Sequence, residues 1–124
     1  MNMEAVLKRI GMDVPRWRVL LILNEIGAAS VSEIAAHAVS KLPTMTKTVQ
    51  RLEKDGLVRT NSRQTDARVT EVALTTRGRQ IVARVRPKGS LVFEQAFRDI
   101  DDESVARLVA LLEQIFANLR THRK

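Results

Sequence analysis

Residues 43–56 read Pro43-Thr44-Met45-Thr46-Lys47-Thr48-Val49-Gln50-Arg51-Leu52-Glu53-Lys54-Asp55-Gly56. Met45, Val49 and Leu52 recur at the spacing of one helical face, and Gly56 suits the left-handed conformation in which many helices end. At about 100° per residue the opposite face contains no acid. It presents Pro43, Lys47, Gln50 and Lys54, flanked by Thr44, Thr46 and Arg51. The alternative is an ordinary solvated face, but such faces usually mix Glu with Lys, so the pattern favours a helix that faces a polyanion.

A hairpin is predicted directly after this helix. Leu57–Thr60 and Val69–Leu74 are short β-like runs, and the polar stretch between them carries Arg63 and Arg68. The expected hairpin therefore has a basic tip.

Two further helices are predicted before residue 43. The first runs from Pro15 to Ile26 and is apolar on nearly all sides, which indicates a buried central helix. Residues Ser30-Val31-Ser32-Glu33 then match the capping box, in which a Ser hydroxyl and a Glu side chain satisfy free amides at a helix start. A short helix to about Ala38 is expected there.

The C-terminal third of the chain predicts two helices. One begins at Thr75 or Thr76, bends or breaks near Pro87-Lys88-Gly89-Ser90, and continues to Phe97. The other begins at Asp101-Asp102-Glu103, acids that favour a helix N-terminus. Its stripe of Val105, Leu108, Leu112, Ile115 and Leu119 has more apolar surface than one small domain needs to cover. We expect Leu108, Leu112, Ile115 and Leu119 to meet a second subunit.

The charge of the chain is regional. The 124 residues have a formal net charge of +7, yet residues 41–88 alone have twelve basic and four acidic side chains, which makes +8. A solvated, evenly charged surface would spread this excess, so its localisation favours neutralisation of phosphates. Aromatic residues make up only 3%, and burial by Leu, Val, Ile and Ala predicts a helix-rich fold.

Other classes of function find little support in the sequence. The lack of cysteine excludes disulfides, thiolate catalysis and Cys-ligated zinc, and His37 and His122 lie far apart with no acid at metal-ligand spacing. No phosphate loop, nucleophile elbow or Ser/His/Asp pattern is present, so neither an enzyme nor a cofactor is expected. No segment is apolar for long enough to be a signal peptide or membrane span, so a cytoplasmic protein is expected.

The order helix, helix, turn, polar-faced helix and basic-tipped hairpin is that of a winged helix-turn-helix. The sequence resembles the multiple-antibiotic-resistance regulator (MarR) family over nearly all residues from Gly11 onward. The resemblance lies in Gly11-Met12-Asp13-Val14-Pro15-Arg16-Trp17-Arg18-Val19-Leu20, in Pro43–Val58, and most specifically in Asp66-Ala67-Arg68 followed by Val72-Ala73-Leu74-Thr75-Thr76-Arg77-Gly78. It implies a dimeric transcription regulator, most often a repressor, and many such regulators release DNA when a small anionic or aromatic ligand binds.

The resemblance also implies roles for single residues. Residues 43–54 correspond to the recognition helix, and Thr44, Thr46, Lys47, Gln50 and Arg51 would face the major groove, with Lys54 on the same face. In the wing, Arg68 resembles the arginine that enters the minor groove, and Asp66 the acid that orients it. The alternative for this pair is a turn-stabilising salt bridge. Arg63 is expected to add a contact to the DNA backbone.

Two departures from the family pattern affect these expectations. The family has a long first helix before the position of Gly11, whereas this chain has ten residues there, so a shortened N-terminal helix is expected. The turn at Ala38-Val39-Ser40-Lys41-Leu42 lacks the glycine common in the family, and Ser40 is a candidate N-cap of the recognition helix.

The sequence thus predicts a mainly α (α+β) winged helix-turn-helix. The expected parts are a short helix and lead-in at 1–14, a DNA-binding region at 15–76, and dimerisation helices at 77–124. The expected function is sequence-specific DNA binding by a homodimeric repressor on a pseudo-palindromic operator. The alternative is a winged-helix protein-interaction module without operator binding.

Overall fold

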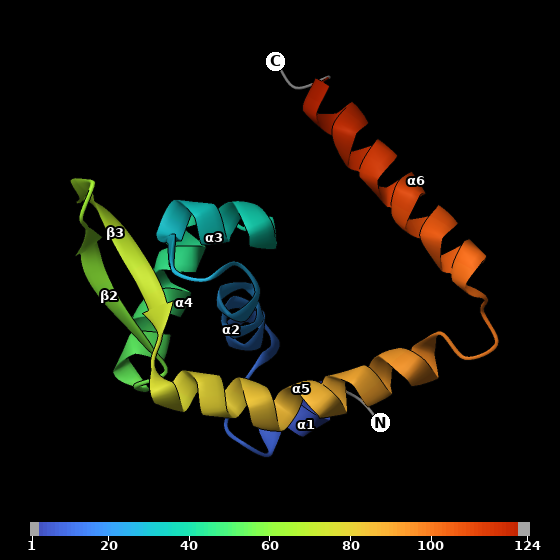
Figure 1. The fold of residues 1–124 in the computed structure, drawn as a ribbon, viewed down its shortest axis with the longest axis horizontal. Coiled ribbons are helices and arrows are strands. Elements are labelled where there is room, and N and C mark those ends of the chain that lie inside the picture. The colour runs from blue at the N-terminus through green and yellow to red at the C-terminus, as the bar shows by residue number, and fades with distance from the viewer. Residues whose placement is uncertain (1–2, 122–124) are drawn as a thin grey trace. The chain divides into compact units, whose positions relative to one another are not determined.

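The computed structural model describes residues 3–121, apart from the side chains of Ser90 and Thr121 (Figure 1). The described residues form helices α1 (Met3–Lys8), α2 (Val14–Ile26), α3 (Val31–Ala38), α4 (Leu42–Lys54), α5 (Thr76–Ala96) and α6 (Asp102–Thr121). The strands are β1 (Ala29–Ser30), β2 (Val58–Arg63) and β3 (Asp66–Leu74). The prediction of a mainly helical winged helix-turn-helix is confirmed.

The chain divides into two compact units, one up to Val92 and one from Phe93. We call them the N-terminal unit and the C-terminal unit. The division lies later than the boundary expected after Thr76, because Val82 and Val85 of α5 are buried in the core of the N-terminal unit. The first half of α5 therefore packs on the core of the N-terminal unit, and the dimerisation region expected at 77–124 stays a prediction.

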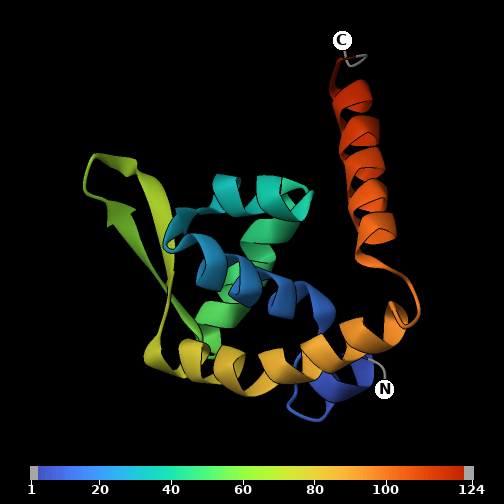
Figure 2. The same cartoon turned by 45° about the vertical axis from the view of Figure 1, so that its right-hand side comes forward.

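The core of the N-terminal unit is built around α2. Asp13 caps this helix by accepting a hydrogen bond from the Arg16 amide at 3.0 Å, and Gly27 ends it with a φ of 81°. Trp17, Val19 and Leu20 are buried on it. Figure 2 shows α3 and α4 beside α2 and the hairpin of β2 and β3 at one side.

The turn between α3 and α4 has an unusual backbone. The capping box of Ser30 and Glu33 is present as predicted and starts α3. Val39 ends α3 with a φ of 51°, a left-handed conformation that is unfavourable for a β-branched residue. The expectation for Ser40 is wrong, because the N-cap of α4 is Lys41, and α4 has no side-chain cap. The Ser40 hydroxyl instead donates to the Lys41 carbonyl oxygen at 3.3 Å.

The sheet has the order β1-β3-β2, and both pairings are antiparallel. The two long strands extend further than predicted, so residues 61–63 and 66–68 belong to strands, and the register shifts between Ser62 and Arg63, where Arg63 pairs with Asp66 and Ser62 with Thr70. A polar strand on an exposed hairpin lacks the apolar alternation that a sequence-based prediction needs. The wing is therefore a paired two-stranded ribbon from Val58 and Leu74 to Ser62 and Thr70, with an irregular register towards its tip.

The beginning of α5 is held tightly against the end of α4. The Thr75 hydroxyl accepts a hydrogen bond from the Gly78 amide at 3.1 Å and donates to the Gly56 carbonyl oxygen at 2.7 Å. A Cβ atom at Gly78 would lie 2.1 Å from the Leu57 carbonyl oxygen. This close approach explains why the Leu74-Thr75-Thr76-Arg77-Gly78 stretch needs glycine at its last position.

Of the bend or break predicted near Pro87 the break is wrong, because α5 continues through it as a single helix, while the bend stays a prediction. Proline removes one backbone donor, which leaves the carbonyl of Ala83 without its helical partner. Both residues are exposed, so water reaches that carbonyl. Val82 and Val85, buried before the proline, hold the helix on the core.

The C-terminal unit contains α6. Asp101 caps it by accepting a hydrogen bond from the Ser104 amide at 2.7 Å, which confirms the predicted helix start. None of its described residues is buried. Leu108, Leu112, Ile115 and Leu119 are 46%, 45%, 53% and 62% exposed and form one apolar stripe.

Candidate nucleic-acid interface

The predicted polar face of α4 is present. Met45, Val49 and Leu52 are buried on one side of the helix, as the spacing predicted. The residues expected on the other side are exposed or half-buried. They are Thr44, Thr46, Lys47, Gln50, Arg51 and Lys54.

The hydroxyl groups on α4 are partly engaged with the helix itself. The Thr46 hydroxyl donates to the Leu42 carbonyl oxygen at 2.9 Å, and the Thr48 hydroxyl donates to that of Thr44 at 3.0 Å. Each keeps lone pairs that accept hydrogen bonds. Because the N-terminus of α4 has no side-chain cap, its first amides are also open to an anion.

The wing presents Arg68 with a side chain that is 91% exposed. Asp66 braces this residue, because its carboxylate accepts hydrogen bonds from the Arg68 amide at 3.1 Å and from Nε at 3.2 Å. These bonds lower the pKa of Asp66 below its ordinary value, so the carboxylate stays charged. The predicted pairing of the two side chains is thus present.

Arg63 has a different environment from Arg68. Its guanidinium lies 2.6 Å from Glu33 on α3 and 3.0 Å from Glu71 on β3, and its side chain is 30% exposed. The contact with the DNA backbone expected for Arg63 stays a prediction, and it competes with these two ion pairs.

An open groove of about 650 Å³ lies between α4 and the wing. Thr46 and Gln50 line it from α4, and Arg63 and Arg68 line it from the hairpin. Two acids, Glu33 and Glu53, also line it. Glu53 accepts hydrogen bonds from the Thr60 amide at 3.1 Å and the Thr60 hydroxyl at 2.7 Å, which ties α4 to β2. Helix α4 and the wing thus frame a groove that carries both signs of charge.

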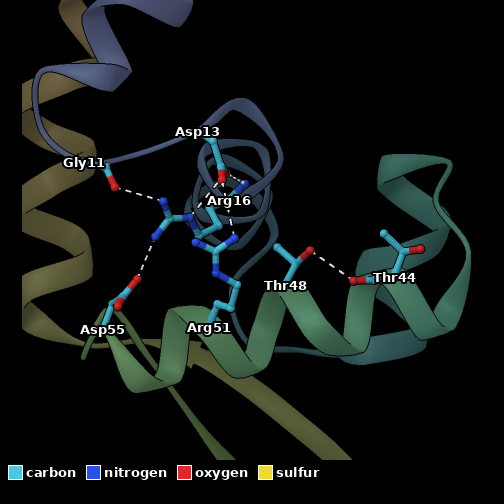
Figure 3. A network of polar contacts seen from close by, with 7 residues as sticks. All are labelled: Gly11, Asp13, Arg16, Thr44, Thr48, Arg51 and Asp55. Carbon is cyan, nitrogen blue, oxygen red and sulfur yellow. Dashed lines mark hydrogen bonds and ion pairs between the residues drawn. The ribbon is translucent and has the colours of Figure 1, made fainter.

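A polar network that sequence reasoning missed holds the other end of α4 (Figure 3). Arg16 lies at its centre, with its side chain only 11% exposed. It donates to the Asp55 carboxylate at 2.7 Å and to the Gly11 carbonyl oxygen at 2.9 Å. Its Nε lies 3.3 Å from Asp13, an ion pair without hydrogen-bond geometry. The network fixes the end of α4 to the start of α2.

Asp13 is charged in this network and also attracts a residue of the polar face. Partial burial raises the pKa of Asp13, but the hydrogen bonds and charge of Arg16, with the charge of Arg51, outweigh it and lower the pKa. Arg51 lies 3.8 Å from Asp13 and is 64% exposed, so it is held only loosely. The Asp13-x-x-Arg16 spacing is the one signal in the sequence that points to this network.

Metal and membrane chemistry receive no support from the described part of the chain. Within residues 3–121 no three potential ligands among His, Asp and Glu come together as for a metal ion. His37 is exposed, and His122 lies outside the described residues. No helix among the described ones has the length and hydrophobicity needed to cross a bilayer.

Comparison with known proteins assigns this chain to a family. The family model described as MarR matches residues 12–70. The transcriptional repressor IacR of Pseudomonas putida is 48% identical over 120 residues, which span 97% of this chain and 72% of that protein. The chain belongs to the MarR family. It is a winged-helix DNA-binding transcription regulator, and its matched relatives are regulators and not enzymes.

Solved structures agree with this assignment to the MarR family. The crystal structure of the transcriptional regulator PA4135 superposes with a TM-score of 0.80 at 28% identity, covering 95% of this chain and 84% of that one. Bordetella bronchiseptica BpsR, whose DNA binding is regulated by 6-hydroxynicotinic acid, shares the fold with a TM-score of 0.74 at 22% identity. That match covers 84% of this chain and 79% of BpsR. Regulators of the MarR family bind DNA as dimers.

Proposed function

We propose that this chain is a homodimeric repressor that places α4 in the major groove and the wing in the adjacent minor groove of a pseudo-palindromic operator. The observation that carries the proposal is the pairing of an acid-free, exposed face on α4 with a braced, exposed arginine on the wing. Two-fold symmetry of the protein then requires two half-sites related by the same symmetry.

In this proposal α4 both binds phosphate and reads bases. Lys47, Gln50 and Arg51 have donors that match the edges of guanine and adenine in the major groove. Thr44, Thr46 and the uncapped amides lie at the N-terminal end of α4, where the helix dipole favours a phosphate. Lys54, in the last turn, supplies charge to the backbone of the DNA.

Arg68 is the proposed minor-groove residue. A narrow minor groove concentrates negative potential and attracts an inserted arginine. Asp66 leaves the Arg68 side chain 91% exposed while it restricts its direction. This geometry limits the rotamer freedom that the side chain loses on binding.

In this proposal the N-terminal unit binds DNA, and the apolar stripe of α6 forms the dimer contact. Four leucine and isoleucine side chains about half exposed in one stripe are unusual for a surface that faces water. A second copy of the chain that covers them would place two recognition helices on one duplex.

We also propose that a small anionic or aromatic ligand releases the DNA; 6-hydroxynicotinic acid regulates the DNA binding of BpsR, which shares the fold. A thermal-shift series with that compound and related aromatic acids tests the ligand class. A rise in melting temperature together with loss of DNA binding is the expected result.

Mobility shift with the DNA upstream of the chain's own gene tests the function. Arg68→Ala is expected to weaken binding by tenfold or more without a change in melting temperature, because the residue contacts no core. Arg9→Ala, at an exposed residue directly after α1, removes the same charge outside α4, the wing and α6 and serves as the matched control. Equal affinities of both variants and the parent would refute the assignment of the wing.

Salt dependence separates DNA binding from the alternative of a protein-interaction module. Each phosphate contact contributes a slope of about −0.9 to a plot of log affinity against log salt, so several contacts in a dimer predict a steep line. A nearly flat line would favour the protein partner.

A further inference from the structure

Arg63 joins three elements of the fold through two carboxylates. Its Nη2 donates to Glu33 at the start of α3 at 2.6 Å, and its Nε donates to Glu71 on β3 at 3.0 Å, while Arg63 itself ends β2. The planar guanidinium of arginine suits such a bridge, because its donors point in fixed, different directions.

Glu33 has a second role that fixes its position. The same carboxylate oxygen accepts the Ser30 amide at 2.9 Å as part of the capping box of α3. Ser30 pairs with Glu71 in the β1–β3 ladder, so the cluster is connected through the backbone as well. The hydrogen bonds from Arg63 and then Ser30 lower the pKa of Glu33 to about 2. Glu33 is therefore ionised at neutral pH and cannot move away from Arg63 without disturbing the cap.

The position of this cluster in the groove gives it a consequence for DNA binding. In B-DNA a major groove and the neighbouring minor groove are separated by one sugar-phosphate strand. If α4 occupies the first and the wing the second, as proposed above, that strand passes between them. The groove between α4 and the wing contains Glu33 and Glu53 as well as Arg68. An uncompensated carboxylate there would repel the phosphates.

We propose that Arg63 is a positioning residue that ties the wing to α3 and neutralises Glu33 in the groove and Glu71 on β3, and that it makes no phosphate contact of its own. This inference rests on the proposed function for its DNA part but not for the anchoring of the wing. The two arginines of the hairpin therefore have different roles. Arg68 is almost fully exposed, whereas the guanidinium of Arg63 forms ion pairs with both Glu33 and Glu71.

The anchoring of the wing is tested without DNA. Amide hydrogen exchange of residues 58–74 is compared in the parent, Arg63→Gln and Arg63→Lys, with the buried amides of α2 as an internal reference. Lysine keeps the charge but cannot bridge two acids with a planar fork. We expect exchange in the wing to accelerate about tenfold or more in both variants and exchange in α2 to stay unchanged. Unchanged exchange in the wing would overturn the anchor.

The compensation of charge is tested with a double-mutant cycle on DNA affinity, using Glu33→Gln as the partner variant. Glutamine retains the acceptor that the capping box needs, so α3 keeps its start. We expect Arg63→Gln to weaken binding about tenfold with the same salt slope, and Glu33→Gln to restore much of that loss in the double variant.

A direct phosphate contact predicts a different pattern. Arg63→Gln would then reduce the salt slope by about 0.9, Arg63→Lys would bind nearly as tightly as the parent, and Glu33→Gln would give no rescue. That pattern would overturn the inference. If the parent itself fails to bind its upstream DNA, the proposed function fails, and the exchange experiment still decides whether Arg63 anchors the wing.

Discussion

The N-terminal unit buries most of its large apolar side chains, whereas helix α6 leaves its own exposed. In the N-terminal unit Leu20, Ile34, Leu52 and Val72 have no exposed surface, and one core connects α2, α3, α4 and the sheet. In α6 every described residue remains at least partly exposed, although the helix has a continuous apolar stripe. Helices in proteins gain most of their stability from the packing of an apolar face. The comparison teaches that the first region covers its apolar residues within one unit, whereas the stripe of α6 is covered only if a partner packs on it, as proposed above.

The largest effect on assembly and DNA binding is expected from charged substitutions in the apolar stripe of α6. Leu112→Glu combined with Ile115→Lys places charges in the stripe, where each side chain would otherwise gain roughly 1.5 to 3 kcal/mol on burial. We expect sedimentation to show monomers or unfolded chains, and mobility shift to show loss of operator binding.

The matched control for that variant places the same charges on the opposite face of α6. Ala110→Glu with Gln114→Lys forms a favourable pair one helical turn apart and should leave the dimer intact. A parent chain that sediments as a compact monomer at micromolar concentration would contradict the proposed dimer contact along the apolar stripe of α6.

A second variant tests how closely the N-terminal unit is packed. Gly78→Ala would place a Cβ 2.1 Å from the Leu57 carbonyl oxygen, and we expect overpacking to reduce the free energy of unfolding by about 1–3 kcal/mol. Gly89→Ala on the same helix meets only the Met3 side chain at 3.6 Å. It should stabilise the chain by up to about 1 kcal/mol, because alanine is the better helix former. Denaturant unfolding of the two variants should therefore shift in opposite directions.

A smaller effect is expected in the turn between α3 and α4. Val39→Gly relieves a left-handed conformation that costs roughly 1–2 kcal/mol for a residue with a Cβ, while glycine loses about 0.5–1 kcal/mol in entropy. The net gain in unfolding free energy should be about 0.5–1 kcal/mol. Ala38→Gly, one residue earlier and helical, should destabilise instead. Similar destabilisation by both variants would show that the turn carries no strain.

The smallest expected effect is a loss of folding stability at acidic pH. Arg63 and Ser30 lower the pKa of Glu33 from its ordinary 4.5 to about 2 in the folded chain. The resulting stabilisation is complete above the ordinary pKa and is lost as the pH falls from about 4.5 towards 2. Because the ion pair is exposed, the shift in melting temperature should be slight. Glu33→Gln should remove this part of the acid response, and identical pH profiles for parent and variant would argue against the lowered pKa. The stripe of α6 has no titrating side chain and should not share this response.

The sequence predicted the elements that have a periodic signal and missed those that depend on distant partners. Spacing of Met45, Val49 and Leu52 placed the buried face of α4, and the Ser30–Glu33 motif placed the start of α3. The link from Arg16 to Asp55 joins residues 39 positions apart, and no local pattern announces it. The same is true of Arg63, whose partner Glu33 lies 30 positions away.

Backbone details were the other source of error. A proline normally indicates a break, but Pro87 is tolerated because solvent reaches the carbonyl that it frees. Ser40 has the right side chain for a helix cap, yet the left-handed turn at Val39 shifts the start of α4 to Lys41. Both outcomes depend on the local path of the chain, which residue type alone does not determine.

The close approach at Gly78 has a mechanical consequence. A helix whose first turn is fixed to its neighbour transmits a rotation to it, whereas a helix joined by a flexible link does not. The start of α5 is fixed in this way, because the Thr75 amide donates to the Leu57 carbonyl oxygen at 3.1 Å and the Thr75 hydroxyl donates to the Gly56 carbonyl oxygen at 2.7 Å. A rotation of the first turn of α5 would therefore displace Gly56 and Leu57, the residues that directly follow the end of α4.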